Sequence, residues 1–569
     1  MDIKRLFLIL ATIVSITSAW AQAELTENNP LDTLKAEIVI LDTLEERVDP
    51  KILLVEMNDF LAGKRKNEDD LFIPHLIYQE NFHLFSPINL DVRFKKNGFT
   101  EIPFTTSNIQ TVQNNRDIFR AEYKRGNIFY NSWDYNLPVA ITESYMGLGD
   151  NDMNNIAVSL MKGGIFGIPK FDIQLDYLGE EGTWLGTNEV SKNFHLHLKY
   201  DLNFAQIYFE NSIFDQELPG EKDVDGYYYN DDYVYLKENE YSVLVQNSVL
   251  DLGLKYNFSD YIMNSWHPET GKIFQKERNL LQFLTQKKIE TKDHKIDFSY
   301  EYVIEDNSIE NTIRDSSYHI LSFDQDSNFK RLSIGNTGYF QDKNIFQLNS
   351  EVAYEIFNGF SLLGEYCSSS SNDHQYRHLF NYKTRSRVGG GIIFHSSHLK
   401  TKFMFGQNSN RTSGGLYHTI KNSVDYFEVQ NLVDLSINKF EIVVRNWLRN
   451  EEISEDWILD YHYYYYIEYY PEWQLSNLLE LRYLLEHNNE IIIGLKHIYH
   501  SNYSYFLNSI DSPRTTDTQN IDAYLKIQLT DRFEISIDAI NVTNNKIMFL
   551  DRNHPGTHFN FNVHWIFAN

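Results

Sequence analysis

The sequence predicts an all-β fold: a transmembrane antiparallel β-barrel of about 16–22 strands, preceded by an export signal and a small N-terminal segment. Three observations predict it. The N-terminus is basic and then apolar, apolar and polar residues alternate along most of the chain, and the chain is 15% aromatic with only 12 prolines in 569 residues. Alternation has the period of a β-strand. Aromatic residues favour strands, whereas proline interrupts them.

The first 21 residues have the layout of a secretory signal. Lys4 and Arg5 precede an apolar run from Leu6 to Ile16, and Ala19-Trp20-Ala21 supplies small residues for signal peptidase. The run is too short for a lasting membrane helix. We therefore predict cleavage after Ala21 and a mature N-terminus at Gln22, with cleavage after Ala23 as the alternative. The alternative, a buried helix of a cytosolic protein, does not explain the three regions in this order.

Composition argues against a nucleic-acid-binding protein and against an exported protein stabilised by disulfides. The formal net charge of −28 gives the chain no electrostatic attraction to nucleic acid. Cys367 is the only cysteine, so no intrachain disulfide can stabilise the exported protein.

The segment 115–569 alternates as membrane-crossing strands do. In 170–177, Phe171, Ile173, Leu175 and Tyr177 share one face and polar residues share the other, and 194–200, 296–302, 346–355 and 533–539 repeat the pattern. Strands of about ten residues can cross a bilayer at a tilt. We expect tight turns at 358–359, 438–439 and 531–532, and long loops at 211–240, 368–391 and 501–520. Short turns on one rim and long loops on the other are typical of barrels.

The polar faces supply candidate lumen-facing residues, most of them acidic. These are Asp172, Asp176, Asp297, Glu301, Glu351, Glu355, Asp460, Tyr464, Tyr466, Glu468, Glu534 and Asp538. Carboxylates along an open aqueous path would favour cations. The two tyrosines could stack on a sugar or another flat solute, although packing inside a narrow or plugged barrel is the simpler explanation.

We expect no catalytic centre, no metal site and no cofactor. Neither a glycine-rich phosphate loop nor a Gly-x-Ser-x-Gly elbow occurs. His195 and His197 share a strand face at a spacing that zinc sites use, but no third ligand can be named. The acidic loop 223–232 lacks the spacing of a helix-loop-helix calcium site.

The C-terminus carries the most specific pattern. Phe559, Phe561, Val563, Trp565 and Phe567 lie on one face of a strand that can close the barrel. Together with the Asn-rich segment 541–546 and His554-Pro555-Gly556, this strand resembles the last hairpin of TonB-dependent receptors and related putative porins. The close resemblance covers some 35 residues, and Ala568 and Asn569 after Phe567 depart from the usual aromatic end. The resemblance implies a Gram-negative outer membrane, contact with its lipid, and assembly by the barrel-assembly machinery.

The resemblance leaves the region 22–114 open between two interpretations. A TonB-dependent receptor would carry a short acidic-apolar box and a glycine-bearing plug. Glu37–Leu41 resembles such a box, and the stretch from Lys96-Asn97-Gly98-Phe99 to Arg125-Gly126 faintly resembles a plug. From Glu24 to Asn114, however, only Gly63 and Gly98 are glycines. A periplasmic extension is therefore favoured over a reduced plug.

We predict that the barrel passes small solutes passively, as a porin does, and that it is not an enzyme. The alternative is a TonB-dependent importer with a reduced plug, for which TonB would be a partner. A second alternative is a secreted soluble all-β binding protein or enzyme, since soluble sandwiches also alternate.

Overall fold

The computed structural model describes most of the chain from residue 119 onward. It covers 93–102, 119–125, 127–149, 154–165, 168, 170–184, 187–202, 204–219, 233–264, 273–309, 312–341, 345–371, 380–414, 419–451, 473–486, 489–501, 517–529, 532–543 and 557–568. Short pieces are also described at 55–57, 59–61, 76–77, 84–85, 548–549 and 552–553. The predicted signal peptide lies outside the described residues and stays a prediction.

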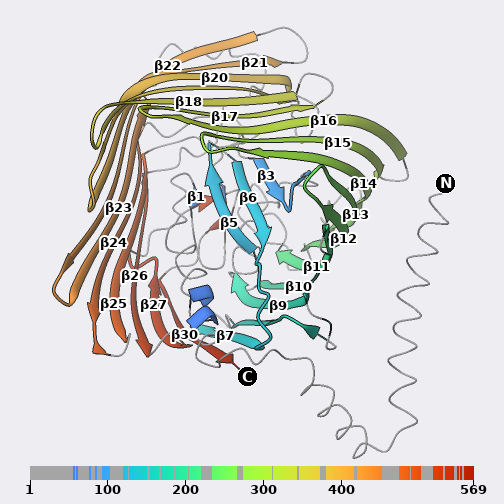
Figure 1. Cartoon of the computed structure of the whole chain (residues 1–569), viewed down its shortest axis with the longest axis horizontal. Coiled ribbons are helices and arrows are strands. Elements are labelled where there is room, and N and C mark those ends of the chain that lie inside the picture. Colours follow the sequence, from blue (N-terminus) through green and yellow to red (C-terminus); the bar gives the residue numbers. More distant parts are fainter. Residues whose placement is uncertain are drawn as a thin grey trace, which may run out of the picture. The chain divides into compact units, whose positions relative to one another are not determined.

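Twenty-two strands form one closed antiparallel barrel in sequence order, which confirms the predicted fold (Figure 1). The ring closes where β30 pairs with β7, with Phe561 opposite Leu148. The strands are β7 (Ile141–Gly149), β8 (Asn154–Lys162), β9 (Phe171–Trp184), β10 (Thr187–Leu202), β11 (Ala205–Pro219), β12 (Tyr233–Gln246), β13 (Asp251–Asn264), β14 (Ile273–Glu290), β15 (His294–Ile309), β16 (Thr312–Phe329), β17 (Leu332–Gln341), β18 (Ile345–Phe357), β19 (Phe360–Ser371), β20 (Phe380–His395), β21 (Leu399–Gly414), β22 (Thr419–Ile437), β23 (Phe440–Glu451), β24 (Trp473–Leu484), β25 (Glu490–His500), β26 (Thr518–Leu529), β27 (Phe533–Ile540) and β30 (His558–Ala568).

Many strands are longer than the predicted ten residues. β22 has 19 residues, and β14 and β16 have 18 each. The predicted loops were therefore too long: β11 runs to Pro219, β19 to Ser371, and β26 begins at Thr518. Strands of this length exceed what a bilayer crossing requires, so their pairing continues into segments whose polar composition suggested loops.

Connections alternate between two kinds, as predicted for the two rims of a barrel. Asn358-Gly359 joins β18 to β19 and Asn438-Lys439 joins β22 to β23. Gly359 and Asn438 take positive φ values of 81° and 56°, as tight hairpin turns require. Longer connections lie at the other ends of β19 and β23, at residues 372–379 and 452–472.

Burial along the strands is the reverse of that in a water-soluble protein. Asp172, Gln174 and Asp176 of β9 are buried, whereas Tyr177 on the opposite face is exposed. On β30, Phe561 and Trp565 are 44% and 47% exposed. A polar interior with an apolar exterior is the pattern of a barrel in lipid. In the described part of the chain, no helix is both long and apolar enough to span a membrane.

A second, four-stranded sheet precedes the barrel in the chain. It comprises β3 (Arg93–Lys96), β4 (Phe99–Thr100), β5 (Phe119–Lys124) and β6 (Asn127–Ser132), in the order β4-β3-β6-β5. We call residues 93–102 and 119–132 the inner sheet, because its blue strands lie within the ring of barrel strands in Figure 1. The predicted division at residue 114 stays a prediction, but the inner sheet has strands on both sides of it, and the first barrel strand begins at Ile141.

Two much smaller sheets complete the described strands. β1 (Leu76–Ile77) pairs with β2 (Leu84–Phe85), and β28 (Met548–Phe549) pairs with β29 (Arg552–Asn553).

Candidate functional site

The inner sheet is bound to the barrel wall by side chains of consecutive strands. Among the described residues, its hydrogen bonds, ion pairs and ring contacts reach strands from β10 to β18. Most of the polar contacts come from three parts of the inner sheet: residues 100–102, residues 124–125, and residues 96–97 together with Ser132.

Residues 100–102, which we call the strap, are held along their backbone. The Thr100 amide donates to both carboxylate oxygens of Glu301 at 3.1 Å, and its hydroxyl donates to the same carboxylate at 2.6 Å. Gln282 donates to the Thr100 carbonyl at 2.9 Å. Arg278 donates to the Ile102 carbonyl at 2.8 Å. The wall therefore satisfies polar groups that an edge of a sheet would otherwise leave unpaired in a buried position.

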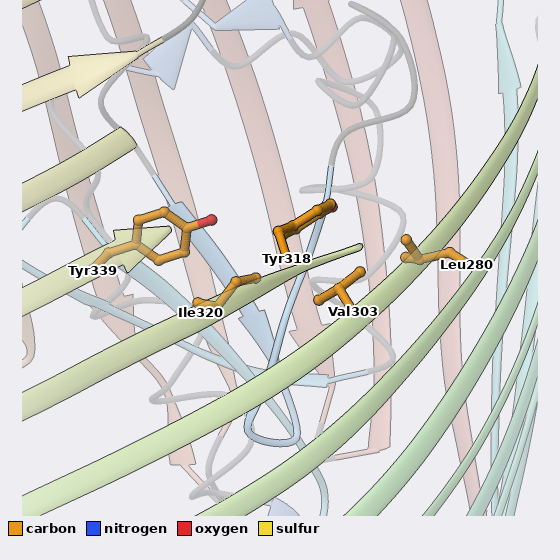
Figure 2. Packing of buried hydrophobic residues seen from close by; sticks show 5 residues of the cluster. All are labelled: Leu280, Val303, Tyr318, Ile320 and Tyr339. Carbon is orange, nitrogen blue, oxygen red and sulfur yellow. The ribbon is translucent and has the colours of Figure 1, made fainter. Parts of the chain in front are cut away.

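The side chain of Ile102 packs against an apolar cluster on the wall. The cluster comprises Leu280, Val303, Tyr318, Ile320 and Tyr339, from β14 to β17 (Figure 2). Nearby, Phe99 packs with Leu244 and Leu284 of β12 and β14. Apolar contact thus adds to the polar contacts of the strap.

A pair of cations occupies the turn between β5 and β6. Lys124 and Arg125 both pair with Asp324 and Asp326 of β16; the Arg125–Asp324 distance is 3.2 Å. Asn349 of β18 donates to the Arg125 carbonyl. The side chains of these four charged residues are between 16% and 28% exposed, so water screens this contact more than it screens the strap.

A third contact joins the inner sheet to β11, β12 and β13. Lys96 pairs with Glu240 at 3.0 Å, and its ammonium lies 4.7 Å above the Phe119 ring. Lys255 pairs with Glu240 and with Glu101 of the strap, both at 2.7 Å. Beside this group, Glu210 accepts hydrogen bonds from Asn97 and Ser132.

The two adjacent lysines of β3 differ in their surroundings. Burial alone would lower the pKa of Lys96, but the carboxylates of Glu240, Glu210 and Glu101 outweigh it and raise that pKa above its usual value. Burial dominates at Lys95, whose pKa is lowered, and its ammonium donates to the Ser299 hydroxyl. Wall carboxylates attract both lysines, and the balance between this attraction and burial differs between the two positions.

Two wall glycines leave space for side chains of the inner sheet. A Cβ at Gly253 of β13 would lie 2.6 Å from the Phe99 ring. A Cβ at Gly335 of β17 would overlap the guanidinium of Arg125. Any larger residue at either position would displace the inner sheet or the strand.

The predicted lumen-facing residues fall into three groups. Asp172, Asp176, Glu301 and Asp538 are buried, and Asp297, Glu351, Glu355 and Glu534 are partly buried. Asp460, Tyr464, Tyr466 and Glu468 lie outside the described residues. Of the eight that are described, Glu301 contacts the inner sheet, whereas Asp176 pairs with His195, and Asp297 accepts a bond from Gln286. The structure thus brings only part of this set to one place, and the lumen-facing role of the set remains a prediction.

The closing strand carries its apolar residues on one face, as the sequence suggested. Phe559, Phe561, Trp565 and Phe567 are exposed and Val563 is partly exposed. Asn560 and Asn562, on the opposite face, are buried.

Sequence reasoning missed four acids of this interface and all of its bases. Glu210, Glu240, Asp324 and Asp326 were not among the candidates, although each lies in an alternating strand. The bases had a usable signal: Lys95-Lys96 and Lys124-Arg125 are adjacent cation pairs in a strongly acidic chain.

His195 and His197 have a simpler explanation than a metal site. Their Nδ1 atoms lie 3.0 Å from carboxylates of Asp176 and Glu210, respectively. Within the described residues, no three histidine, cysteine or acidic side chains come together as metal ligands would.

The comparisons with known proteins concern the fold. No protein-family model and no curated protein sequence matches the chain. Among solved structures, the siderophore receptor PirA from Acinetobacter baumannii aligns with a TM-score of 0.62 at 8% identity, over 84% of this chain and 90% of that one. A mutant of the ferric enterobactin receptor PfeA from Pseudomonas aeruginosa aligns with a TM-score of 0.64 at 9% identity, over 84% and 90%. The ferric-catecholate import receptor Fiu from Escherichia coli K12 aligns with a TM-score of 0.56 at 10% identity, over 78% and 83%.

The chain therefore has the fold of an outer-membrane transport barrel. Its 22 strands and closure resemble those of TonB-dependent receptors of Gram-negative bacteria, which confirms the predicted resemblance and agrees with the predicted location. These neighbours are receptors rather than enzymes. In fold, the 22-strand barrel matches the importer alternative better than the porin that the sequence placed first.

Proposed function

We propose that this protein is a TonB-coupled importer of a small solute, and that the inner sheet serves as its plug. The observation that carries the proposal is the seating of a separate sheet on the wall through the strap, where Glu301, Gln282 and Arg278 bind backbone groups of residues 100 and 102. A segment held in this way blocks part of the lumen until it moves. The neighbouring siderophore receptors support the proposal.

Two further partners belong to the proposal. The exposed apolar residues of the strands, such as Phe561 and Trp565, would contact outer-membrane lipid. The aromatic face of β30 would be recognised by the barrel-assembly machinery. No solute is specified by the neighbours, because a likeness at 8–10% identity carries the fold alone.

Energy coupling is tested at the box-like segment Glu37–Leu41. The full chain in detergent should bind the periplasmic domain of TonB from its own bacterium, and Val39→Pro should abolish the binding because proline removes a backbone donor. Leu31→Pro, outside the segment, is the matched control. Absence of binding by the unaltered chain would contradict TonB coupling.

A passive channel is the second candidate. One observation favours it: the contacts described above join the inner sheet to β10 through β18, which are nine of the 22 barrel strands. Conductance of the purified, unaltered chain in a planar bilayer, without any energy source, would favour this candidate. A closed barrel would favour the importer.

A further inference from the structure

We propose that the path uncovered when the inner sheet moves selects cationic solutes. The inference rests on the proposed plug role and names the solute class for it. It follows from the binding partners of the wall carboxylates. On one side of the barrel these partners belong to the inner sheet, and on the other side they belong to the wall.

Carboxylates on β11 to β16 are bound by cations and donors of the inner sheet. Glu240 binds Lys96, while Asp324 and Asp326 bind Lys124 and Arg125. Glu301 binds the strap, and Glu210 binds Asn97 and Ser132. Each of these carboxylates therefore has at least one partner on the inner sheet.

Three carboxylates on β19 to β27, those of Glu365, Glu480 and Glu534, are paired with cations of the wall itself. Glu365 pairs with Arg387 of the adjacent strand and with Lys402 at 3.5 Å. Glu480 pairs with Arg482 at 2.6 Å. Glu534 pairs with Lys526 at 3.8 Å. These charges stay compensated whether or not the inner sheet is in place.

Movement of the inner sheet therefore changes the charge of only one half of the lumen. It removes the charges of the inner sheet, which are six basic residues (Arg93, Lys95, Lys96, Arg120, Lys124 and Arg125) and two acids (Glu101 and Glu122). Lys255 stays beside Glu240, and His197 stays beside Glu210. The described ion pairs of Asp324 and Asp326 are then lost, because Lys124 and Arg125 make all of them. Glu301 keeps only the more distant attraction of Lys255 on the wall. A water-filled path lined by such carboxylates concentrates cations and repels anions.

The cations of the inner sheet show what the exposed wall can hold. Two of them, an ammonium and a guanidinium, already bind Asp324 and Asp326 at the β5–β6 turn. A solute carrying an amine or a guanidine could form the same pairs once that turn has left. The wall is thus complementary to cations by contact as well as by overall charge.

The experiment opens the lumen without changing any charge. Gly253→Val and Gly335→Val together place side chains where Phe99 and Arg125 are seated. The full-length double variant should conduct in a planar bilayer, and its reversal potential under a potassium chloride gradient should show cation preference. Gly364→Val is the matched control, because the nearest atom to a Cβ there is 4.0 Å away, and it should behave as the unaltered chain.

Neutralising the wall tests the cause of the preference. Adding Glu301→Gln, Asp324→Asn and Asp326→Asn to the double variant should lower the cation-to-anion permeability ratio by roughly twofold or more. Anion preference of the opened channel, or a ratio unchanged by neutralisation, would overturn the inference.

If the double variant does not fold, as judged by the heat-modifiable band, the inner sheet is loosened instead with moderate urea in the unaltered chain. The conductance and the reversal potential are then measured in the same way. An absence of conductance under both conditions would contradict the plug role and with it the present inference. Conductance without cation preference would contradict the inference alone and leave the importer proposal standing.

Discussion

The Glu301 carboxylate is the wall group whose removal should most weaken the seating of the inner sheet. It is fully buried and accepts from the Thr100 amide, the Thr100 hydroxyl and the Gln282 side chain. Glu301→Ala leaves these three donors without their acceptor. A buried donor that loses its partner costs about 1–3 kcal/mol, and such costs are not fully additive. We therefore expect a local destabilisation of about 3 kcal/mol at the strap.

Amide hydrogen exchange measures this effect directly. Since each 1.4 kcal/mol corresponds to a factor of about ten, exchange at Thr100 should accelerate by roughly 100-fold. Amides of β24 should exchange as before, because they lie on the opposite half of the barrel's strand order. Asp538→Asn, on a buried wall residue that contacts Ser536 and Asn562, is the matched control. Unchanged protection of Thr100 in Glu301→Ala would refute the idea that this carboxylate seats the inner sheet.

The remaining predictions concern the turn, the N-terminus and the closing strand. Arg125→Ala should cost only about 1 kcal/mol, since its ion pairs are partly exposed, and should accelerate exchange in β6 several-fold without affecting Thr100. N-terminal sequencing of outer-membrane protein should give Gln22-Ala23-Glu24, and an intact Met1 would contradict export through a cleaved signal. Phe561→Asp with Trp565→Asp should abolish the heat-modifiable band, because a charge facing lipid costs up to roughly 2–4 kcal/mol near the midplane, less for Asp than for Arg. Asn560→Ser on the inward face should be tolerated, and equal loss in both variants would mean that β30 faces no lipid.

The period-two pattern predicted the fold class only together with the signal-like N-terminus and the two kinds of connection, because the strands of soluble sandwiches also alternate. It also identified the faces: Asp172 and Asp176 are buried, while Tyr177 is exposed. It could not give the strand ends. Long strands that extend past the bilayer lose the apolar face that reveals them, so polar residues at the ends of β11 and β19 were taken for loops.

Only one side of the candidate site, the wall residue Glu301, could be predicted from the sequence. Glu301 could be proposed because it alternates with apolar neighbours on β15. Its partner Thr100 could not, since the two residues are 201 positions apart and no local pattern links them. The scarcity of glycine before residue 114 argued against a plug, yet the glycines that seat Phe99 and Arg125 are Gly253 and Gly335 of the barrel wall.

The acids of the wall on β11 to β16 and the basic residues of the inner sheet compensate each other's charge. The acids that the sequence assigned to the lumen, such as Asp172, Asp297 and Glu301, predict a cation-selective path if the lumen is open. The structure adds further acids on β11 to β16, which the inner sheet covers. The dibasic pairs at 95–96 and 124–125 instead bring compensating charge from a distant part of the same chain. Burying that many carboxylates without partners would be costly. The same acids can therefore hold the inner sheet in place in one state and define the solute path in another.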